Sequence, residues 1–205
     1  MFMPNDYTEA EAVDRYVRLV QGTQTFRIVS SLEKDGSNNN THIWGYVGWW
    51  KHDPEDIKEK AKVERWPHGE SAPDKPWTDH VKPFVALTVY EYASNTCKLW
   101  DIPQKTIRDD LASFYRDEVW GDLRGYDVDV IRSGEEKQTR YKVIPKPKAK
   151  LTDEARAIVL ETLPLINVAA LFTGEDPFEA LGPVTTVAPV ATAAVEEVEE
   201  DDAPW

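Results

Sequence analysis

Aromatic and basic side chains alternate along short segments of this chain in a way suited to holding an unpaired nucleic acid strand. Within residues 41–50, Trp44, Tyr46 and Trp50 fall on one side of a period-two pattern. A nucleobase that stacks on such a ring gains about 1–3 kcal/mol, and nearby Lys and Arg side chains neutralise the phosphates. Because every base has a flat face, this chemistry accepts any base sequence. The pattern therefore predicts a sequence-nonspecific site for a single strand.

Neighbouring segments supply further members of the predicted site. Phe84 alternates with the apolar Val85, and Trp100 shares a side with Lys98 on the segment that follows. The charged connection 51–82 adds tryptophans and cations that would form a basic flap over a groove. Besides the three rings of residues 41–50, the contacts predicted from these patterns are Arg27, Lys51, Lys62, Arg65, Trp66, Trp77, Lys82, Phe84, Lys98, Trp100, Arg140 and Lys142.

A purely structural interpretation competes with this one. Helices at the two ends of the chain could cover half of these rings, which would then belong to the hydrophobic core. The connection 51–82 could equally be a charged surface loop with Trp66 packed against the fold. Period-two alternation assigns side chains to two faces but does not say which face meets water.

Six strands and three helices are predicted to position these side chains. The strands follow apolar alternation bounded by turn residues, at 25–32, 41–50, 83–92, 96–101, 126–132 and 139–145. One helix is expected at 8–20 and a second after Pro103, with Ile107, Leu111 and Phe114 on one apolar stripe. A third helix is expected at 153–163, with Thr152 as its N-cap.

This order predicts a mainly β fold with α. Its architecture would be an OB-fold-like antiparallel barrel of five or six strands, with a capping helix before the last hairpin. An antiparallel sandwich is the competing architecture. The predicted organisation is an N-terminal helical segment at 1–20, an OB-fold domain at 21–150 with a long inserted loop at 51–82, a helical segment at 151–181, and a flexible acidic tail at 182–205.

Charge is distributed unevenly along the chain. The net charge is −13, yet residues 151–205 hold one cation and twelve acids, so residues 1–150 carry 23 cations and 25 acids. The body is nearly neutral, and a local basic groove is compatible with it.

The last ten residues combine six carboxylates with a final tryptophan. Such a run cannot bury enough apolar surface to fold, which predicts a solvated tail. The aromatic end would anchor in the pocket of another protein, steered there by the acids. An acidic solubilising tail is the alternative. The residues predicted to bind a partner are Glu199, Glu200, Asp201, Asp202, Pro204 and Trp205.

Several other functions find no support in the sequence. No apolar run reaches the roughly 18–20 residues of a membrane helix, and no secretory signal is recognised. The single cysteine, Cys97, excludes an intramolecular disulfide and suits the cytoplasm. Four histidines and this thiol lack the short spacing of a zinc site, and no catalytic motif is present. Asp127 and Asp129 alternate as nuclease carboxylates can, but strand-face acids are commoner. No enzyme activity, cofactor or metal is predicted.

Two segments, 120–134 and 139–145, carry a family resemblance. The first contains a Gly-Tyr-Asp strand that ends in Arg-Ser-Gly, and the second contains Thr-Arg-Tyr-Lys-Val and ends in Pro. With the acidic tail, these motifs resemble those of phage single-stranded-DNA-binding proteins. The resemblance adds Arg132 and Thr139, together with Arg140, to the predicted DNA contacts. The chain departs from the family in lacking a zinc cysteine cluster and in the length of its loop at 51–82.

The resemblance implies a non-enzymatic OB-fold protein that coats and protects single-stranded DNA during phage replication, recombination and repair in the host cytoplasm. Its tail would recruit a polymerase, helicase or primase, and further copies could assemble along the DNA. The alternative is a phage scaffold or interaction protein whose aromatic face binds a protein. A nuclease is a third possibility.

Overall fold

A computed structural model describes residues 14–30, 41–53, 55–75 and 81–181. Seven strands of this part of the chain form one antiparallel sheet, to which helices are added, so the predicted mainly β class with α is confirmed. The strands are β1 (Gly22–Ile28), β2 (Ile43–Trp50), β3 (Lys62–Pro67), β4 (Lys82–Glu91), β5 (Thr96–Ile102), β6 (Asp127–Ser133) and β7 (Arg140–Pro145). The α-helices are α1 (Lys105–Arg116), α2 (Asp153–Thr162) and α3 (Ala170–Thr173).

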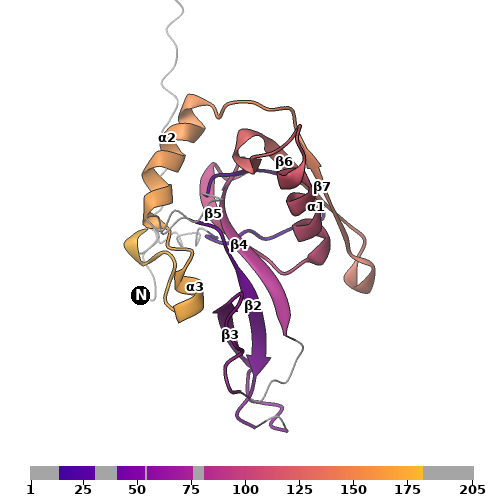
Figure 1. The fold of residues 1–205 in the computed structure, drawn as a ribbon, viewed down its shortest axis with the longest axis vertical. Coiled ribbons are helices and arrows are strands. Elements are labelled where there is room, and N and C mark those ends of the chain that lie inside the picture. Colours follow the sequence, from indigo (N-terminus) through magenta and orange to yellow (C-terminus); the bar gives the residue numbers. More distant parts are fainter. Residues whose placement is uncertain (1–13, 31–40, 54, 76–80, 182–205) are drawn as a thin grey trace, which may run out of the picture. The chain divides into compact units, whose positions relative to one another are not determined.

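The long strand β4 organises the sheet (Figure 1). Along one edge its first half pairs with β2 and its second half with β1, while β5 runs along the other edge. The path continues from β1 to β6 and β7, and from β2 to β3. No pairing joins β5 to β7 among the described residues, so the sheet is not the predicted closed barrel.

Strand β3 is an addition to the predicted count of five or six strands. It lies inside the connection 51–82, which was expected to be a loop. Charged residues such as Lys62, Glu64 and Arg65 hide its apolar alternation. It pairs with β2 on one side only, and edge strands commonly carry charges of this kind because they discourage pairing with other chains.

The predicted helix at 8–20 is wrong for residues 14–20, while residues 1–13 lie outside the described part. Residues 14–20 form no helix, and within them Tyr16 bridges to Leu99 of β5. The amide of Val17 donates to the carbonyl of Leu99, and the amide of Leu99 donates to the carbonyl of Arg15, both at 2.9 Å. Pairing with the open edge of β5 satisfies backbone groups that a short helix would have satisfied internally.

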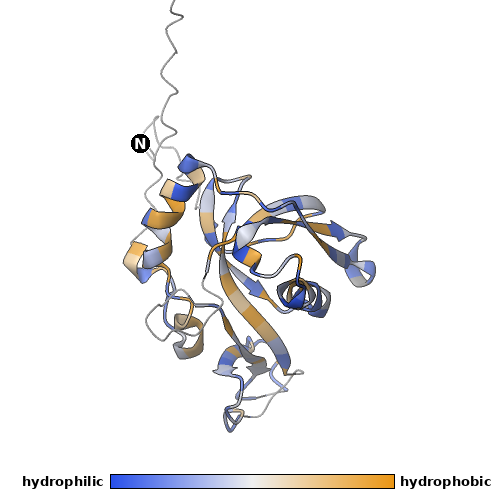
Figure 2. Cartoon of the chain, turned by 45° about the horizontal axis from the view of Figure 1, so that its top comes forward, coloured by the Kyte–Doolittle hydropathy of each residue, from blue (hydrophilic) through white to orange (hydrophobic). Residues whose placement is uncertain are grey.

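Two hydrophobic cores cover the two faces of β4 and β5. One core, built around Phe26, Trp100 and Val128, packs under α1. The other contains Phe84 and Leu99, and is covered by residues of α2, α3 and the turns that follow them. Figure 2 shows α2 with apolar and polar sides, as a helix packed on a sheet requires. Both faces of these strands are therefore withdrawn from water.

Residues 153–173 are long and apolar enough to cross a membrane by length and composition alone. They do not form one continuous α-helix, because α2 ends at Thr162 and Pro164 lies in a 3-10 turn before α3. Val159, Ile166 and Leu171 are buried in the second core. Packing on the sheet thus accounts for part of this apolar content.

Candidate nucleic-acid interface

The β2–β3 hairpin carries a row of rings on one face. Trp44 and Tyr46 lie on β2, Trp66 faces Tyr46 on β3, and His68 follows β3 directly. The imidazole of His68 stacks on the indole of Trp44, with ring centroids 3.8 Å apart and planes inclined by 16°. The ring of Tyr46 lies 5.9 Å from His68 and 6.0 Å from Trp66. The row arises because alternate residues of β2 point to the same face and the pairing with β3 brings Trp66 and His68 beside them.

Trp50 extends the same face at the far end of β2 and attracts two cations. The Nζ of Lys62 lies 5.0 Å from its ring centroid, and the Nζ of Lys75 lies 4.6 Å away. Lys62 is the register partner of Trp50 across the hairpin. Ammonium groups are attracted to the electron-rich face of an indole. Positive charge is thus held beside a ring. We call Trp44, Tyr46, Trp50, His68, Lys62 and Lys75 the aromatic hairpin surface.

Exposure makes this surface available to a ligand. The side chain of Trp44 is 46% exposed even with His68 against it, and Tyr46 and Trp50 are half-buried. The hairpin is anchored on its opposite face, where Val47 is buried in the second core and the Nζ of Lys82 lies 5.2 Å from the ring of Trp49. The rings are therefore presented by a strand whose other face is fixed.

Three predicted ring contacts are corrected by the structure. Phe84 is 0% exposed, Trp100 is 1% exposed, and Trp66 is buried behind Tyr46. Phe84 belongs to the core beneath α2 and α3, and Trp100 belongs to the core beneath α1. Phe84 and Trp100 cannot meet a DNA strand because both faces of β4 and β5 are covered, and Trp66 on β3 is itself only 6% exposed.

Two predicted cation contacts are also wrong. Arg27 is 3% exposed, and its Nε donates to Oδ1 of Asp127 at 2.6 Å. Lys98 is ion-paired with the buried Glu91 at 2.7 Å. Arg65 is partly exposed but pairs with Asp101, also at 2.7 Å. Removing any of these cations would take the neutralising charge away from a carboxylate of the sheet, so their main role is structural.

Other predicted contacts lie on a second hairpin, β6–β7. Arg140 and Lys142 are exposed on β7. Nη1 of Arg132 donates to the carbonyl of Leu19 at 2.8 Å, and Oγ1 of Thr139 donates to the carbonyl of Glu136 at 2.8 Å. These residues share no contact with the aromatic hairpin surface among the described interactions.

The remaining predictions are placed as follows. Lys51 lies at the end of the β2–β3 hairpin, where its Nζ donates to the carbonyl of Asp56 at 3.0 Å. Trp77 and all six predicted partner-binding residues, Glu199, Glu200, Asp201, Asp202, Pro204 and Trp205, lie outside the described residues.

His68 is a member of the surface to which sequence reasoning assigned no binding role, whereas Lys75 was expected only as one cation of the basic flap. His68 was considered only as a possible zinc ligand. His68 was missed because strand β3 was not predicted. The pairing of β3 with β2 places His68 beside Trp44, and the His68 amide donates to the Trp44 carbonyl at 3.3 Å. A recognised β3 would have pointed to His68.

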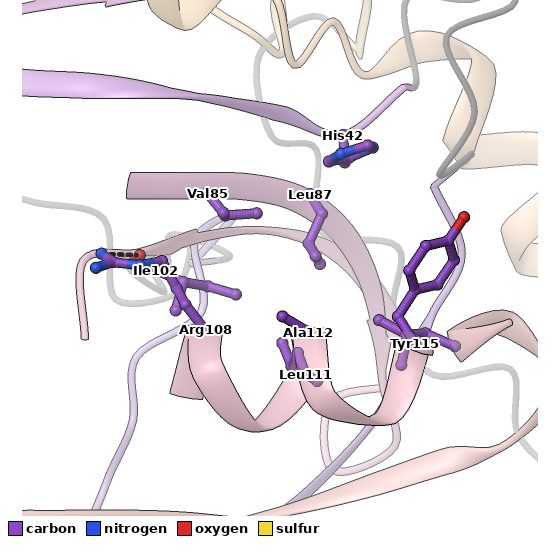
Figure 3. Close-up of a pocket in the computed structure, with 9 residues that line it drawn as sticks. His42, Val85, Leu87, Ile102, Arg108, Leu111, Ala112 and Tyr115 are labelled. Atoms are coloured by element: carbon purple, nitrogen blue, oxygen red, sulfur yellow. Dashed lines mark hydrogen bonds between the residues drawn. The ribbon is translucent and has the colours of Figure 1, made fainter. Parts of the chain in front are cut away.

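An apolar cavity of about 190 Å³ lies between β4 and α1 (Figure 3). Val85, Leu87 and Leu111 line it, and His42 and Tyr115 lie near its edge. The strand pairing places Val85 beside Trp44, so the cavity and the hairpin belong to neighbouring parts of the sheet.

Groups outside the aromatic hairpin surface that could take part in chemistry are engaged within the fold. Among the described residues, no three His, Cys, Asp or Glu side chains are grouped to hold a metal ion. Burial raises the pKa of the Cys97 thiol to about 12, so it stays neutral and is a poor nucleophile or ligand. Asp127 accepts from Arg27 and Tyr92, and Asp129 pairs with Lys146 at 2.9 Å. These two carboxylates are therefore engaged within the fold.

Gly45 allows the hairpin to pack closely, and we expect Gly45→Ala to disturb it. An added Cβ would lie 2.1 Å from the carbonyl oxygen of Trp66 and 3.1 Å from a ring carbon of Phe172. Overpacking of this kind costs about 1–3 kcal/mol. Urea unfolding should show this loss. Gly125→Ala is the matched control, because no atom lies within 4 Å of its added Cβ. Equal stability of the two variants would contradict the close approach.

Comparison of the chain with protein-family models, curated proteins and solved structures finds no match.

Proposed function

We propose that this protein binds single-stranded DNA without sequence preference, as a non-enzymatic coat that protects the strand. The observation that carries the proposal is the aromatic hairpin surface, where the stacked rings of Trp44 and His68 share a face of the β2–β3 hairpin with Trp50, whose ring is flanked by the ammonium groups of Lys62 and Lys75. Rings hold unpaired bases and cations hold the phosphates between them. Duplex bases are already stacked, so this surface should favour single strands.

Strand order supports an OB-fold relationship within this proposal. Without the β2–β3 hairpin, five strands remain in the order β5-β4-β1-β6-β7, and α1 lies in sequence between β5 and β6. An OB fold likewise has five strands, and it binds nucleic acid on the face of its second and third strands and on the loops after its first and fourth strands. That face corresponds to β4 and β5, which are covered here, so the loops are the part available for binding. In this correspondence those loops are the β2–β3 insertion and the β6–β7 turn. The two groups of predicted contacts lie on them.

The direct test is a titration with oligo-dT and with a duplex of equal length, followed by tryptophan fluorescence at two salt concentrations. We expect quenching by the single strand, because Trp44 and Trp50 stack on bases, and weaker binding at higher salt. An unchanged spectrum with oligo-dT at low salt would contradict the proposal. Salt-independent binding of a protein in its place would favour the scaffold alternative.

We further propose that the protein acts in phage replication, recombination and repair, and that its acidic end recruits a polymerase, helicase or primase. The support is the sequence resemblance together with six carboxylates and Trp205 within the last ten residues. Anions and an aromatic side chain suit a basic partner surface with an apolar pocket.

Deleting residues 196–205 should tighten binding to oligo-dT at low salt and abolish recruitment. The deletion removes six negative charges that repel DNA phosphates, and salt screens this repulsion, so the gain should shrink as salt rises. Affinity measured at two salt concentrations, with pull-down of the replication proteins, tests both effects. A truncated protein with unchanged affinity and intact recruitment would remove the role proposed for the tail.

A further inference from the structure

A basic hollow of about 780 Å³ lies where the chain passes from β7 to α2. Lys148 and Lys150 come from this connection, Arg156 from α2, and Arg124 from the turn before β6. The connection is the segment that joins β7 to α2 in Figure 1. The hollow shares no residue with the aromatic hairpin surface.

The charge of the hollow is only partly compensated. Arg124 pairs with Asp122 at 2.7 Å, and the buried Arg27 at the base pairs with Asp127. The side chains of Lys148, Lys150 and Arg156 are exposed, and no ion pair is recorded for them within the described part of the chain. Asp153 is the single acid in the lining. The three exposed cations thus exceed the lining acid by two charges.

Hydrogen bonds hold the basic connection against the body. Nη1 of Arg27 donates to the carbonyls of Arg124 at 3.3 Å and Ala149 at 3.0 Å. The amide of Ala149 donates to the carbonyl of Gly125 at 3.2 Å, and the amide of Lys146 donates to the carbonyl of Asp127 at 2.8 Å. The backbone between Lys148 and Lys150 is therefore fixed, which lowers the entropic cost of binding an anion there.

Asp122, which lies outside the lining of the hollow, interacts with the charge of Lys148 inside it. Hydrogen bonds from Arg124 lower the pKa of Asp122, and the charge of Lys148 contributes to this shift. Asp122 therefore stays ionised and occupied by Arg124, which leaves the two lysines and Arg156 as the groups available to an incoming anion.

We propose that the basic hollow binds phosphate groups of the nucleic acid backbone, as a second contact for the strand held by the aromatic hairpin surface. This inference rests on the proposed function. No aromatic ring lines the hollow, so bases would not be held there, whereas ammonium and guanidinium groups bind phosphate directly. A strand must be long enough to reach both places.

The test compares the double variant Lys148→Ala/Lys150→Ala with Lys105→Ala/Arg116→Ala, which removes two exposed cations of α1. Each protein is titrated over a salt series with oligo-dT of about 8 and about 30 nucleotides, since one OB fold covers roughly 4–16 nucleotides. For the longer strand, loss of two phosphate contacts should lower the salt slope by about 1.4 and the affinity about 25-fold near 0.1 M salt. The shorter strand and the α1 control should behave as the wild-type protein does.

Each other outcome overturns the assignment in a recognisable way. If the hollow variant binds the long strand with wild-type affinity and slope, the hollow holds no phosphate, while quenching by oligo-dT still upholds the proposed function. If no protein binds any oligonucleotide, both fail. If the variant loses only a preference for 5′-phosphorylated strands, the site takes a terminal phosphate. If the variant gains affinity, as the tail deletion should, the hollow holds the acidic tail.

Discussion

Replacing both Trp44 and Trp50 with alanine will weaken oligo-dT binding at least about 30-fold. Each base stacked on a ring contributes about 1–3 kcal/mol, so two rings contribute at least about 2 kcal/mol. Trp44 is 46% exposed and Trp50 is half-buried, so their removal should cost the fold little. The measurement is a binding titration with a labelled oligonucleotide, accompanied by a urea unfolding curve for each protein.

Tyr115→Ala is the matched control for this experiment. Tyr115 lies on α1 and is 47% exposed, almost the same as Trp44, but it is not part of the aromatic hairpin surface. We expect it to bind oligo-dT as the wild-type protein does. Wild-type affinity in the double tryptophan variant, or an equal loss in the tyrosine variant, would show that the hairpin rings are not the binding platform.

Replacing Trp100 with alanine will instead lower the free energy of unfolding by about 3–5 kcal/mol. Trp100 is 1% exposed and stacks on Phe26, with ring centroids 5.2 Å apart. Truncation would leave a large cavity in the core beneath α1, which rigid neighbours fill only in part. Chemical unfolding measures the loss, and the folded fraction should retain its affinity for oligo-dT.

The conservative variant Trp100→Phe keeps an aromatic ring in the same core and should recover much of the stability. A Trp100→Ala protein with full stability but weakened DNA binding would contradict the packing role and support the surface contact that the sequence pattern predicted. Rings that bind DNA should thus change the affinity for oligo-dT, whereas rings that pack in a core should change the free energy of unfolding.

Alternation located most strands but could not tell a covered face from an open one. Strands β4 and β5 lie close to the segments predicted at 83–92 and 96–101. Their second faces were expected to be open, yet Phe84 and Trp100 lie in two different cores. When both faces of a strand are buried, period two carries no information about which side meets water. For Phe84 that information lay in residues 151–181, and for Trp100 it lay in α1 together with β1 and β6; all of this packing is long-range or depends on tertiary structure.

The candidate site was predicted in part for the same reason. Trp44, Tyr46 and Trp50 were correctly grouped on one face of β2, because their spacing is local. His68 was not assigned, since its place beside Trp44 depends on β3, whose charged residues hide its alternation. Whether a predicted cation is exposed or paired with a carboxylate also depends on the tertiary structure. The sequence does not reveal that Arg27 has Asp127 as its partner, one hundred positions away.

The division of β4 between β2 and β1 makes the aromatic hairpin surface a separable part of the sheet. The hairpin joins the sheet along Lys82–Ala86, while the strands that enclose the α1 core are linked through the later part of β4 and through β1, β6 and β7. Insertions between two strands can vary in length without changing the pairing of the strands they interrupt. The same framework could therefore carry a shorter, longer or foreign hairpin, and thereby acquire a new ligand, while the core beneath α1 stays as it is and only the second core, which Val47 enters, adjusts.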